Sequence, residues 1–309
     1  MTMKITGAPC SWGVDDPKNP NLPPWSRVLD EAREAGYAGL ELGPYGYMPL
    51  DAGVLGAELD RRGLSLVAGT IFDDLVSPAN LPALLRQADE IGALLKALPS
   101  PEPLPGQRQA TPYLVIIDWG HRERDLAAGR SQAAPRLSDA DWARMVDHIR
   151  QIADLARERH GIRSVIHPHA GGHIEFADEI RRIAADIPDA TAGLCLDTGH
   201  LHYSGMDPAA WLREFAHRLD YVHFKDVDAA RHREVLSGVP VPFFEACARG
   251  VMCPIGQGAL DYGRIRATLE DIGYQGYITV EQERDPRHAD TSLRDVRLSR
   301  EHLRSIGFQ

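Results

Sequence analysis

The segment AGLCLDTGH at residues 192–200 ends a short apolar run with a carboxylate, Asp197, and an imidazole, His200. Three other apolar runs end in the same kinds of side chain: VIHPHA at 165–170, YVHFKDV at 221–227 and YITVEQE at 277–283. If all four runs are parallel barrel strands, their carboxyl ends converge on one mouth, where histidines and carboxylates can bind a divalent metal. The four endings therefore predict a metal site at the rim of a barrel.

Short β-type runs alternate with amphipathic helical patterns along the whole chain. Eight such runs occur, at residues 4–12, 39–43, 65–72, 113–119, 164–170, 192–200, 221–227 and 277–283. A series of βα units gives either a barrel or a doubly wound sheet, and the absence of a Gly-rich phosphate fingerprint after the first run favours the barrel. Barrels of this type reach 309 residues as one unit, so we expect a single (β/α)8 TIM-barrel domain over residues 1–309.

Two long polar segments flank the fourth run. Residues 99–112 contain five prolines in fourteen positions, which is typical of a loop leading into the strand. Residues 120–137 follow the strand, at the end where barrel enzymes build lids. We expect residues 120–137 to cover the mouth.

Charge and cysteine content limit the binding partners and the cellular compartment that fit this chain. The chain has 34 basic and 44 acidic residues, a formal charge of −10 that would repel a phosphate backbone and argues against nucleic acid. Its four cysteines show no CxxC spacing and fit free thiols in a reducing cytosol. No apolar run approaches a membrane span and the first residues lack a secretory pattern, so we expect a cytoplasmic protein with no membrane partner.

Two of the four strand endings carry paired candidate groups. In VIHPHA, His167 and His169 are spaced by two and would face the barrel interior together, as ligands or proton carriers. The alternative is a pair of hydrogen-bonded core histidines. Asp197 and His200 could face one centre from a strand tip and the following loop, although Asp197 could simply cap a helix.

The other two endings add a cation and further carboxylates. His223 and Lys225, again spaced by two, would give an imidazole ligand and a charge that polarises an oxygen, unless the strand lies at a surface edge. Glu281 lies where a last-strand ligand belongs, and Glu283 shares its face one step further out. Because a buried carboxylate without a partner is costly, a bound cation explains Glu281 more readily.

Imidazole and carboxylate ligands without cysteine, with positions left for water or substrate, favour a catalytic metal site. Mn²⁺, Co²⁺, Zn²⁺ and Mg²⁺ all suit this ligand set.

A second group of polar and aromatic residues follows the strands and could line a pocket for a hydroxylated ring: Trp12, Glu41, Tyr45 and Asp118 with its neighbour Trp119. Indole rings could stack on the C–H faces of such a ring, although core packing is an equally ordinary role for an aromatic residue. Arg231, near the seventh run, could clamp a substrate oxygen, or it could be an exposed helix arginine.

Several longer motifs resemble one family. They are APCSWGVDDP, GYAGLELGPYGYMPLD, HPHAGG, LDTGHLHYSGMDP, VHFKDV and VEQERDP. Together they cover nearly the whole chain and resemble the xylose-isomerase-like barrel superfamily of sugar isomerases, epimerases and dehydratases. Within it the chain is most similar to the inosose (2-keto-myo-inositol) dehydratase group, which implies a role in carbohydrate metabolism and inositol catabolism.

The resemblance implies four metal ligands on successive strand ends. Asp197, His223 and Glu281 match the last three ligands of the superfamily, and His167 stands where its epimerases carry a glutamate. The loss of that glutamate argues against a two-glutamate epimerisation. His169 remains an alternative ligand to His167. Mn²⁺ or Co²⁺ is the metal that we expect first, and by analogy with the superfamily we expect a homo-oligomer.

We therefore predict a metal-dependent dehydratase of a keto-polyol, with 2-keto-myo-inositol as the first candidate. Its metal would bind the ketone and a neighbouring hydroxyl, His169 or His200 would move the proton, Lys225 would stabilise negative charge, and Glu281 would hold the metal. A ketose isomerase or 3-epimerase using the same metal site is the strongest alternative. A metallo-endonuclease and a catalytically inactive sugar-binding protein are the others.

Overall fold

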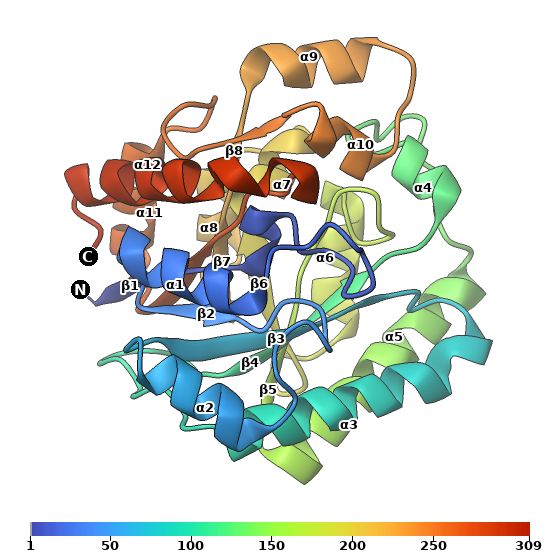
Figure 1. The fold of residues 1–309 in the computed structure, drawn as a ribbon. Coiled ribbons are helices and arrows are strands. Elements are labelled where there is room, and N and C mark those ends of the chain that lie inside the picture. The colour runs from blue at the N-terminus through green and yellow to red at the C-terminus, as the bar shows by residue number, and fades with distance from the viewer. Residues whose placement is uncertain (1) are drawn as a thin grey trace.

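The strands of this chain close into a barrel. The computed structural model describes residues 2–309, and its eight barrel strands are all parallel (Figure 1). They are β1 (Met3–Gly7), β2 (Gly39–Glu41), β3 (Ser65–Asp73), β4 (Tyr113–Asp118), β5 (Arg163–Ile166), β6 (Gly193–Asp197), β7 (Leu219–Phe224) and β10 (Gly276–Val280), in the spatial order β1-β10-β7-β6-β5-β4-β3-β2. The predicted (β/α)8 barrel is confirmed.

Helices surround the barrel and follow the amphipathic patterns of the sequence. They are α1 (Trp25–Ala35), α2 (Ala52–Asp60), α3 (Leu81–Ala97), α4 (Arg122–Leu126), α5 (Asp139–Leu155), α6 (Ala177–Asp186), α7 (Thr198–Tyr203), α8 (Pro208–Glu214), α9 (Ala229–Ser237), α10 (Phe243–Ala248), α11 (Tyr262–Asp271) and α12 (Ser292–Ser305). The last long helix, α12, lies beside α1 (Figure 1) and so closes the ring. Within residues 2–309, no helix has both the length and the apolar composition that a bilayer crossing requires.

Two apolar layers hold these elements together. Inside the barrel, the alternate side chains of the strands fill the interior, among them Val67, Val115, Val165 and Cys195. Outside, the opposite faces of the strands pack against the buried faces of the helices, in one large cluster that runs around the ring. All four cysteines are free thiols, as predicted.

One long insertion departs from the simple βα repeat. After β7 the chain forms β8 (Asp226–Val227) and β9 (Met252–Cys253), which pair antiparallel, with α9 and α10 between them. This insertion has its own apolar cluster, in which Val235, Phe243 and Val251 are buried. The Asp226 carboxylate accepts backbone N–H bonds from Gly256, Gly258 and Leu260 and ties the end of the insertion to its start. In Figure 1, α9 and α10 lie on the same side of the barrel as α4.

Candidate metal centre

Side chains from four neighbouring strand ends meet at the carboxyl-terminal mouth of the barrel. His167 follows β5, Asp197 ends β6, His223 lies in β7 and Glu281 follows β10. The parallel register pairs Asp197 with His223, and the Glu281 N–H donates to the Phe224 carbonyl of β7. One ligand atom from each of the four residues therefore lies within 4.8 Å of the others. We call His167, Asp197, His223 and Glu281 the rim cluster.

The rim cluster contains buried ligand atoms that lack a hydrogen-bond partner. Asp197 Oδ1 accepts the N–H groups of Gly199 at 2.6 Å and His200 at 2.9 Å, so this carboxylate does cap α7. Its second oxygen has no hydrogen-bond partner among residues 2–309, although Lys225 Nζ lies 3.5 Å away, and His223 Nδ1 and both ring nitrogens of His167 also lack a hydrogen-bond partner there. Buried polar atoms without partners are costly. A divalent cation would satisfy this set, so the residues present fit a metal.

His223 has the environment of an oriented metal ligand. Its Nε2 lies 2.8 Å from Glu41 Oε1, and the Tyr221 hydroxyl donates to the same oxygen at 2.7 Å. Ligand histidines usually donate their second N–H to a carboxylate in this way. Its Nδ1 is left facing Glu281 Oε2, 3.1 Å away. Burial alone would lower the pKa of His223, but its neighbours Cys195, Glu281 and Glu41 raise it well above its usual value.

Negative charge is in excess around Lys225. Its Nζ is fully buried and lies 3.2 Å from Glu281 Oε2, 3.5 Å from Asp197 Oδ2 and in a close ion pair with Glu283. Burial would lower the pKa of Lys225, but the three neighbouring carboxylates raise it well above its usual value. With Glu41, four carboxylates lie in this part of the mouth beside one ammonium group. Uncompensated negative charge is costly in a buried site, and a divalent cation would reduce it.

Glu283 was not among the site residues predicted from the sequence, yet it lies in this cluster. Burial raises the pKa of its carboxyl group, against the lowering effect of Lys225. Its Oε2 has no hydrogen-bond partner within the described chain. The spacing of two between Glu281 and Glu283 was the available signal, since a strand turns both side chains to one face.

His169 and His200 lie together beside the rim cluster. Their ring centroids are 3.9 Å apart, and one ring nitrogen of each lies within 4.8 Å of a Glu283 oxygen. Burial, together with nearby positive charge, lowers the pKa of both histidines well below its usual value, so both are neutral. Since His167 and His223 lie in the rim cluster, the structure brings together all four histidines that the sequence predicted for the site.

A pocket of about 110 Å³ opens beside these groups. Its polar lining includes Asp15, Glu41, His169, Glu281 and Glu283, and its apolar lining includes Phe72, Ile117 and Phe244. Phe244 comes from α10, in the insertion after β7. None of residues 120–137 lines the pocket, but this loop contacts the insertion beside it, since Asp125 accepts the Phe243 N–H of α10 at 2.7 Å. A larger surface hollow of about 660 Å³ between α8, α9 and α11 contains none of the clustered ligands.

Of the substrate-binding residues that the sequence predicted, only Glu41 lines the pocket. Trp12 is fully buried in the main core, and its indole N–H donates to Glu31 of α1 at 2.6 Å. Tyr45 packs partly buried against the same core and does not line the pocket. Arg231 is exposed on α9 and donates to the Arg249 carbonyl, which is the ordinary role of a surface arginine.

Asp118 also points away from the pocket, into a second cluster with His121 and His173. Its Oδ1 accepts from His121 Nε2 at 3.0 Å and from the Leu75 N–H at 3.2 Å. Its Oδ2 accepts from the N–H of His173 at 2.8 Å and from His173 Nδ1 at 3.0 Å. We call Asp118, His121 and His173 the Asp118 cluster. Both of its carboxylate oxygens are already saturated with hydrogen bonds.

Comparison with known proteins agrees with this architecture. Residues 29–306 match the family described as xylose isomerase-like TIM barrel. The chain belongs to this family. It is 32% identical over 292 residues to the rhizopine catabolism protein MocC of Rhizobium meliloti, covering 94% of this chain and 84% of MocC. It is 31% identical over 291 residues to the inosose dehydratase of Geobacillus kaustophilus, covering 92% and 88% of the two chains.

The fold is also similar to that of solved structures. The IOLI protein, crystallised with a zinc atom, superposes with a TM-score of 0.69 at 15% identity over 98% of each chain. At this identity the similarity concerns the fold. The resemblance to the superfamily and to inosose dehydratases that the sequence motifs indicated is confirmed by these comparisons.

Proposed function

We propose that the protein is a metal-dependent hydro-lyase that removes water from a keto-polyol, with 2-keto-myo-inositol as its first candidate substrate. The observation that carries the proposal is the convergence of unpartnered ligand atoms of His167, Asp197 and His223 with Glu281 beside a small pocket. The name of the Geobacillus relative, inosose dehydratase, supports the choice of reaction and substrate.

The rim cluster is the site that would hold the metal in this proposal. When bound there, a divalent cation would polarise the ketone oxygen of the substrate and make the adjacent C–H acidic. Mn²⁺ or Co²⁺ is our first choice, and Zn²⁺ or Mg²⁺ also suits histidine with carboxylate ligands. The zinc in the IOLI structure supports the view that this fold can carry such an ion.

His169 is the general base of the proposal. Its Nδ1 lies 2.9 Å from the Ala170 carbonyl, which can only accept a hydrogen bond, so Nδ1 carries the ring proton. Since the ring is neutral, Nε2 has the free lone pair, and His169 lines the pocket. The base takes the proton from the carbon next to the ketone. The C–O bond at the β-carbon then breaks, and the hydroxyl leaves as water with a proton returned by the same imidazole.

Lys225 and the aromatic wall complete the proposed site. The Lys225 ammonium places fixed positive charge 3.2 Å from Glu281, where it would stabilise negative charge that develops on the substrate oxygen. Phe72 and Phe244 give the pocket apolar surfaces for the C–H faces of a polyol ring. Glu41 acts in the proposal mainly by orienting His223.

We extend the proposal to the setting of the enzyme. It would work in the cytosol as one domain on a small-molecule polyol, with no nucleic acid partner, and by analogy with the fold family we expect a homo-oligomer. The free thiols of all four cysteines support a reducing compartment.

One assay tests the reaction directly. The metal-loaded protein is incubated with 2-keto-myo-inositol and a small panel of ketoses in deuterated water, and both water elimination and deuterium uptake are followed. We expect an ultraviolet-absorbing dione or enol product from 2-keto-myo-inositol. Deuterium uptake without loss of water would instead identify a ketose isomerase or epimerase, and no change in any substrate would refute enzymatic action on this class.

A further inference from the structure

A short helix of the insertion after β7 forms one wall of the pocket. Phe244 of α10 lines the pocket and packs edge-to-face against Trp119, with ring centroids 5.1 Å apart, and against Phe72 at 6.1 Å. The preceding residue, Phe243, is fully buried, and its ring centroid lies 5.2 Å from that of His169. The position of α10 therefore sets the shape of the mouth on this side.

The sequence of α10 does little to fix this position by itself. The helix has only six residues, and helices of this length are marginal in isolation. Its N-cap residue is Pro242, whose side chain has no acceptor for the free N–H groups of the first turn. The first of these groups, the Phe243 N–H, needs an acceptor from elsewhere in the chain.

Asp125 of α4 supplies that acceptor from a different loop. Its Oδ1 accepts the Phe243 N–H at 2.7 Å, across 118 positions of sequence. A carboxylate is also the favoured charge at the N-terminal end of a helix. Arg130, in the same loop as Asp125, donates to the Val235 carbonyl of α9 at 2.5 Å. Two hydrogen bonds thus join the loop of residues 120–137 to the insertion.

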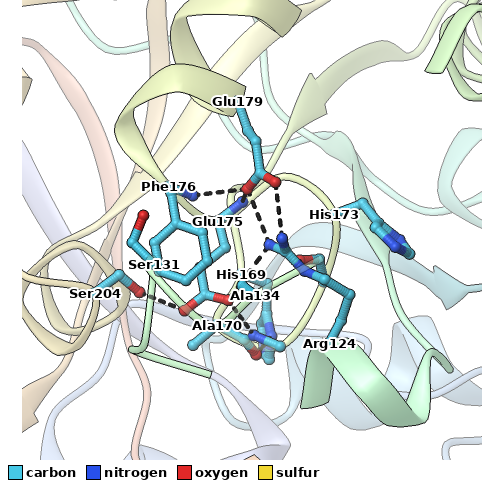
Figure 2. Close-up of polar contacts among 12 residues, drawn as sticks. Arg124, Ser131, Ala134, His169, Ala170, His173, Glu175, Phe176, Glu179 and Ser204 are labelled. Carbon is cyan, nitrogen blue, oxygen red and sulfur yellow. Dashed lines mark hydrogen bonds and ion pairs between the residues drawn. The ribbon is translucent and has the colours of Figure 1, made fainter. Parts of the chain in front are cut away.

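The loop that carries Asp125 is itself held by a buried ion pair. Arg124, the adjacent residue, is fully buried and makes a two-pronged pair with Glu179 of α6 at 2.8 and 2.9 Å (Figure 2). Its guanidinium group also donates to the carbonyls of Pro135 and Gly172, both at 2.9 Å. Arg124 therefore fastens α4 to α6 and to the loop after β5.

Glu175 holds the same loop a few residues further on. Its Oε1 accepts the N–H of Gly129 at 2.7 Å and the hydroxyl of Ser204 at 2.8 Å, and Figure 2 shows the contact with Ser204. Its Oε2 accepts the N–H of Gly171 at 2.9 Å. The segment 124–129 is therefore bound to neighbouring loops at both of its ends, and Asp125 lies within it.

We infer that Asp125 is a positioning residue that caps α10 from the neighbouring loop and so holds the Phe244 ring against the bound substrate. The inference rests on the proposed function, because it takes the ligand of the pocket to be a keto-polyol ring with apolar C–H faces. Asp125 does not itself line the pocket and acts through α10. Residues 120–137 then serve the site as a brace for the wall that Phe244 forms.

Asp125→Ala tests the positioning role in the kinetics of 2-keto-myo-inositol. We expect KM to rise about 3- to 10-fold because a helix cap is lost, with kcat nearly unchanged and bound Zn²⁺ unchanged. Asp125→Asn keeps an acceptor oxygen and should restore most of the wild-type KM. Asp125→Ser, whose hydroxyl ends short of α10, carries the test if Asp125→Ala does not fold. An unchanged KM in the folded variant would refute the role.

A double-mutant cycle shows whether Asp125 acts through Phe244. Phe244→Ala alone should raise KM about 10-fold, because the aromatic contact with the substrate ring is lost. In the Phe244→Ala background, Asp125→Ala should raise KM no further, since the ring that the cap holds is already absent. Two effects that simply multiplied would contradict the inference, because Asp125 would then act by another route.

Hydrogen exchange measures the same coupling without substrate. The amides of residues 243–248 in the Zn²⁺-loaded protein should exchange faster in Asp125→Ala than in wild type, because the helix opens more often. Asp51→Ala is the matched control, since Asp51 caps α2 through the Val54 N–H at 2.9 Å and does not line the pocket. It should leave KM and the exchange of residues 243–248 unchanged. An equal increase of exchange in both variants would refute the inference.

The two readouts separate this inference from the proposed function. Faster exchange of α10 in Asp125→Ala, with no turnover of any keto-polyol by wild type, would support the cap and refute the proposed function together with the substrate contact of Phe244. Normal turnover by wild type, with unchanged exchange of α10 in Asp125→Ala, would refute the inference alone.

Discussion

Two clusters of histidine and carboxylate lie near the carboxyl-terminal end of this barrel, and they differ in what their ligand atoms already do. In the rim cluster, Asp197 Oδ2, His223 Nδ1 and both nitrogens of His167 lack hydrogen-bond partners within the described residues. In the Asp118 cluster, each carboxylate oxygen accepts two hydrogen bonds. The comparison teaches that residue type alone does not define a metal site. Unused lone pairs, held together by the fold, do.

The pKa values of Asp118 and Glu281 are both lowered, but by different kinds of partner. In the Asp118 cluster, hydrogen bonds from His121 and His173 overcome burial and lower the pKa of Asp118 well below its usual value. In the rim cluster, His223 and Lys225 overcome burial and lower the pKa of Glu281. The first carboxylate is stabilised by neutralising hydrogen bonds that leave no oxygen free. The second is ionised and lies 3.1 Å from His223 Nδ1, and a cation that bound there would displace the proton of this ring nitrogen.

The largest expected effect is a loss of activity when the rim cluster, but not the Asp118 cluster, is altered. Glu281→Gln removes a charged ligand without touching the cap of α7 that Asp197 provides. We expect loss of bound metal and a fall in kcat on the order of 10³-fold, with an unchanged circular dichroism spectrum. Asp118→Asn is the control and should keep one metal ion per chain. Full activity of Glu281→Gln would contradict the assignment of the rim cluster.

Removing the metal with a chelator should lower the thermal stability only of proteins whose rim cluster is intact. At metal concentrations about 100 times Kd, binding stabilises the folded chain by about 2.7 kcal/mol, so dialysis against a chelator should lower Tm and abolish turnover. Wild type and Asp118→Asn should lose the same amount, and Glu281→Gln should lose nothing further. Equal chelator sensitivity of all three proteins in thermal melts would show that the metal binds elsewhere.

Asp118→Asn should show its effect on folding. Replacing a buried carboxylate that accepts four hydrogen bonds leaves at least one donor facing an amide N–H, which we expect to cost about 2–3 kcal/mol of unfolding free energy. Urea denaturation of the metal-free protein measures this cost. A variant as stable as wild type would mean that the Asp118 cluster does not hold the β3 and β4 loops.

The smallest expected effect concerns pH. Burial lowers the pKa of His121, but its hydrogen bond and attraction to Asp118 raise the value above 6.5 overall. A raised folded pKa gives stability that is complete below the unfolded value and is lost as pH rises through the folded value. The stability gap between wild type and Asp118→Asn should therefore be wider at pH 6 than at pH 8.5. A gap that widened with pH would contradict the pairing.

The sequence predicted the barrel and its rim for a physical reason. Parallel strands alternate side chains with a period of two and end on one face, so local spacing could place the histidines and Glu281 at the rim. The choice of His167 over His169 as a ligand came from the resemblance to the superfamily. Asp197 caps α7 through Oδ1 and leaves Oδ2 without a hydrogen-bond partner in the described residues, so its cap is compatible with the proposed ligand role.

The remaining residues depended on contacts that local spacing does not encode. Trp12 turned toward Glu31 of α1, and Asp118 turned toward two histidines of neighbouring loops. Phe244 reached the pocket only because the insertion after β7 folds back over the mouth. Glu175 touches the site through a backbone amide, and a sequence pattern carries no sign of such a contact.

Anomalous X-ray scattering from a crystal of the metal-loaded protein would locate the ion most directly. We predict one peak among His167 and Asp197 on one side and His223 Nδ1 and Glu281 on the other. A peak at Asp118, His121 and His173 instead, or no peak at either cluster in a protein that turns over its substrate, would contradict the proposal that unused lone pairs mark the metal site.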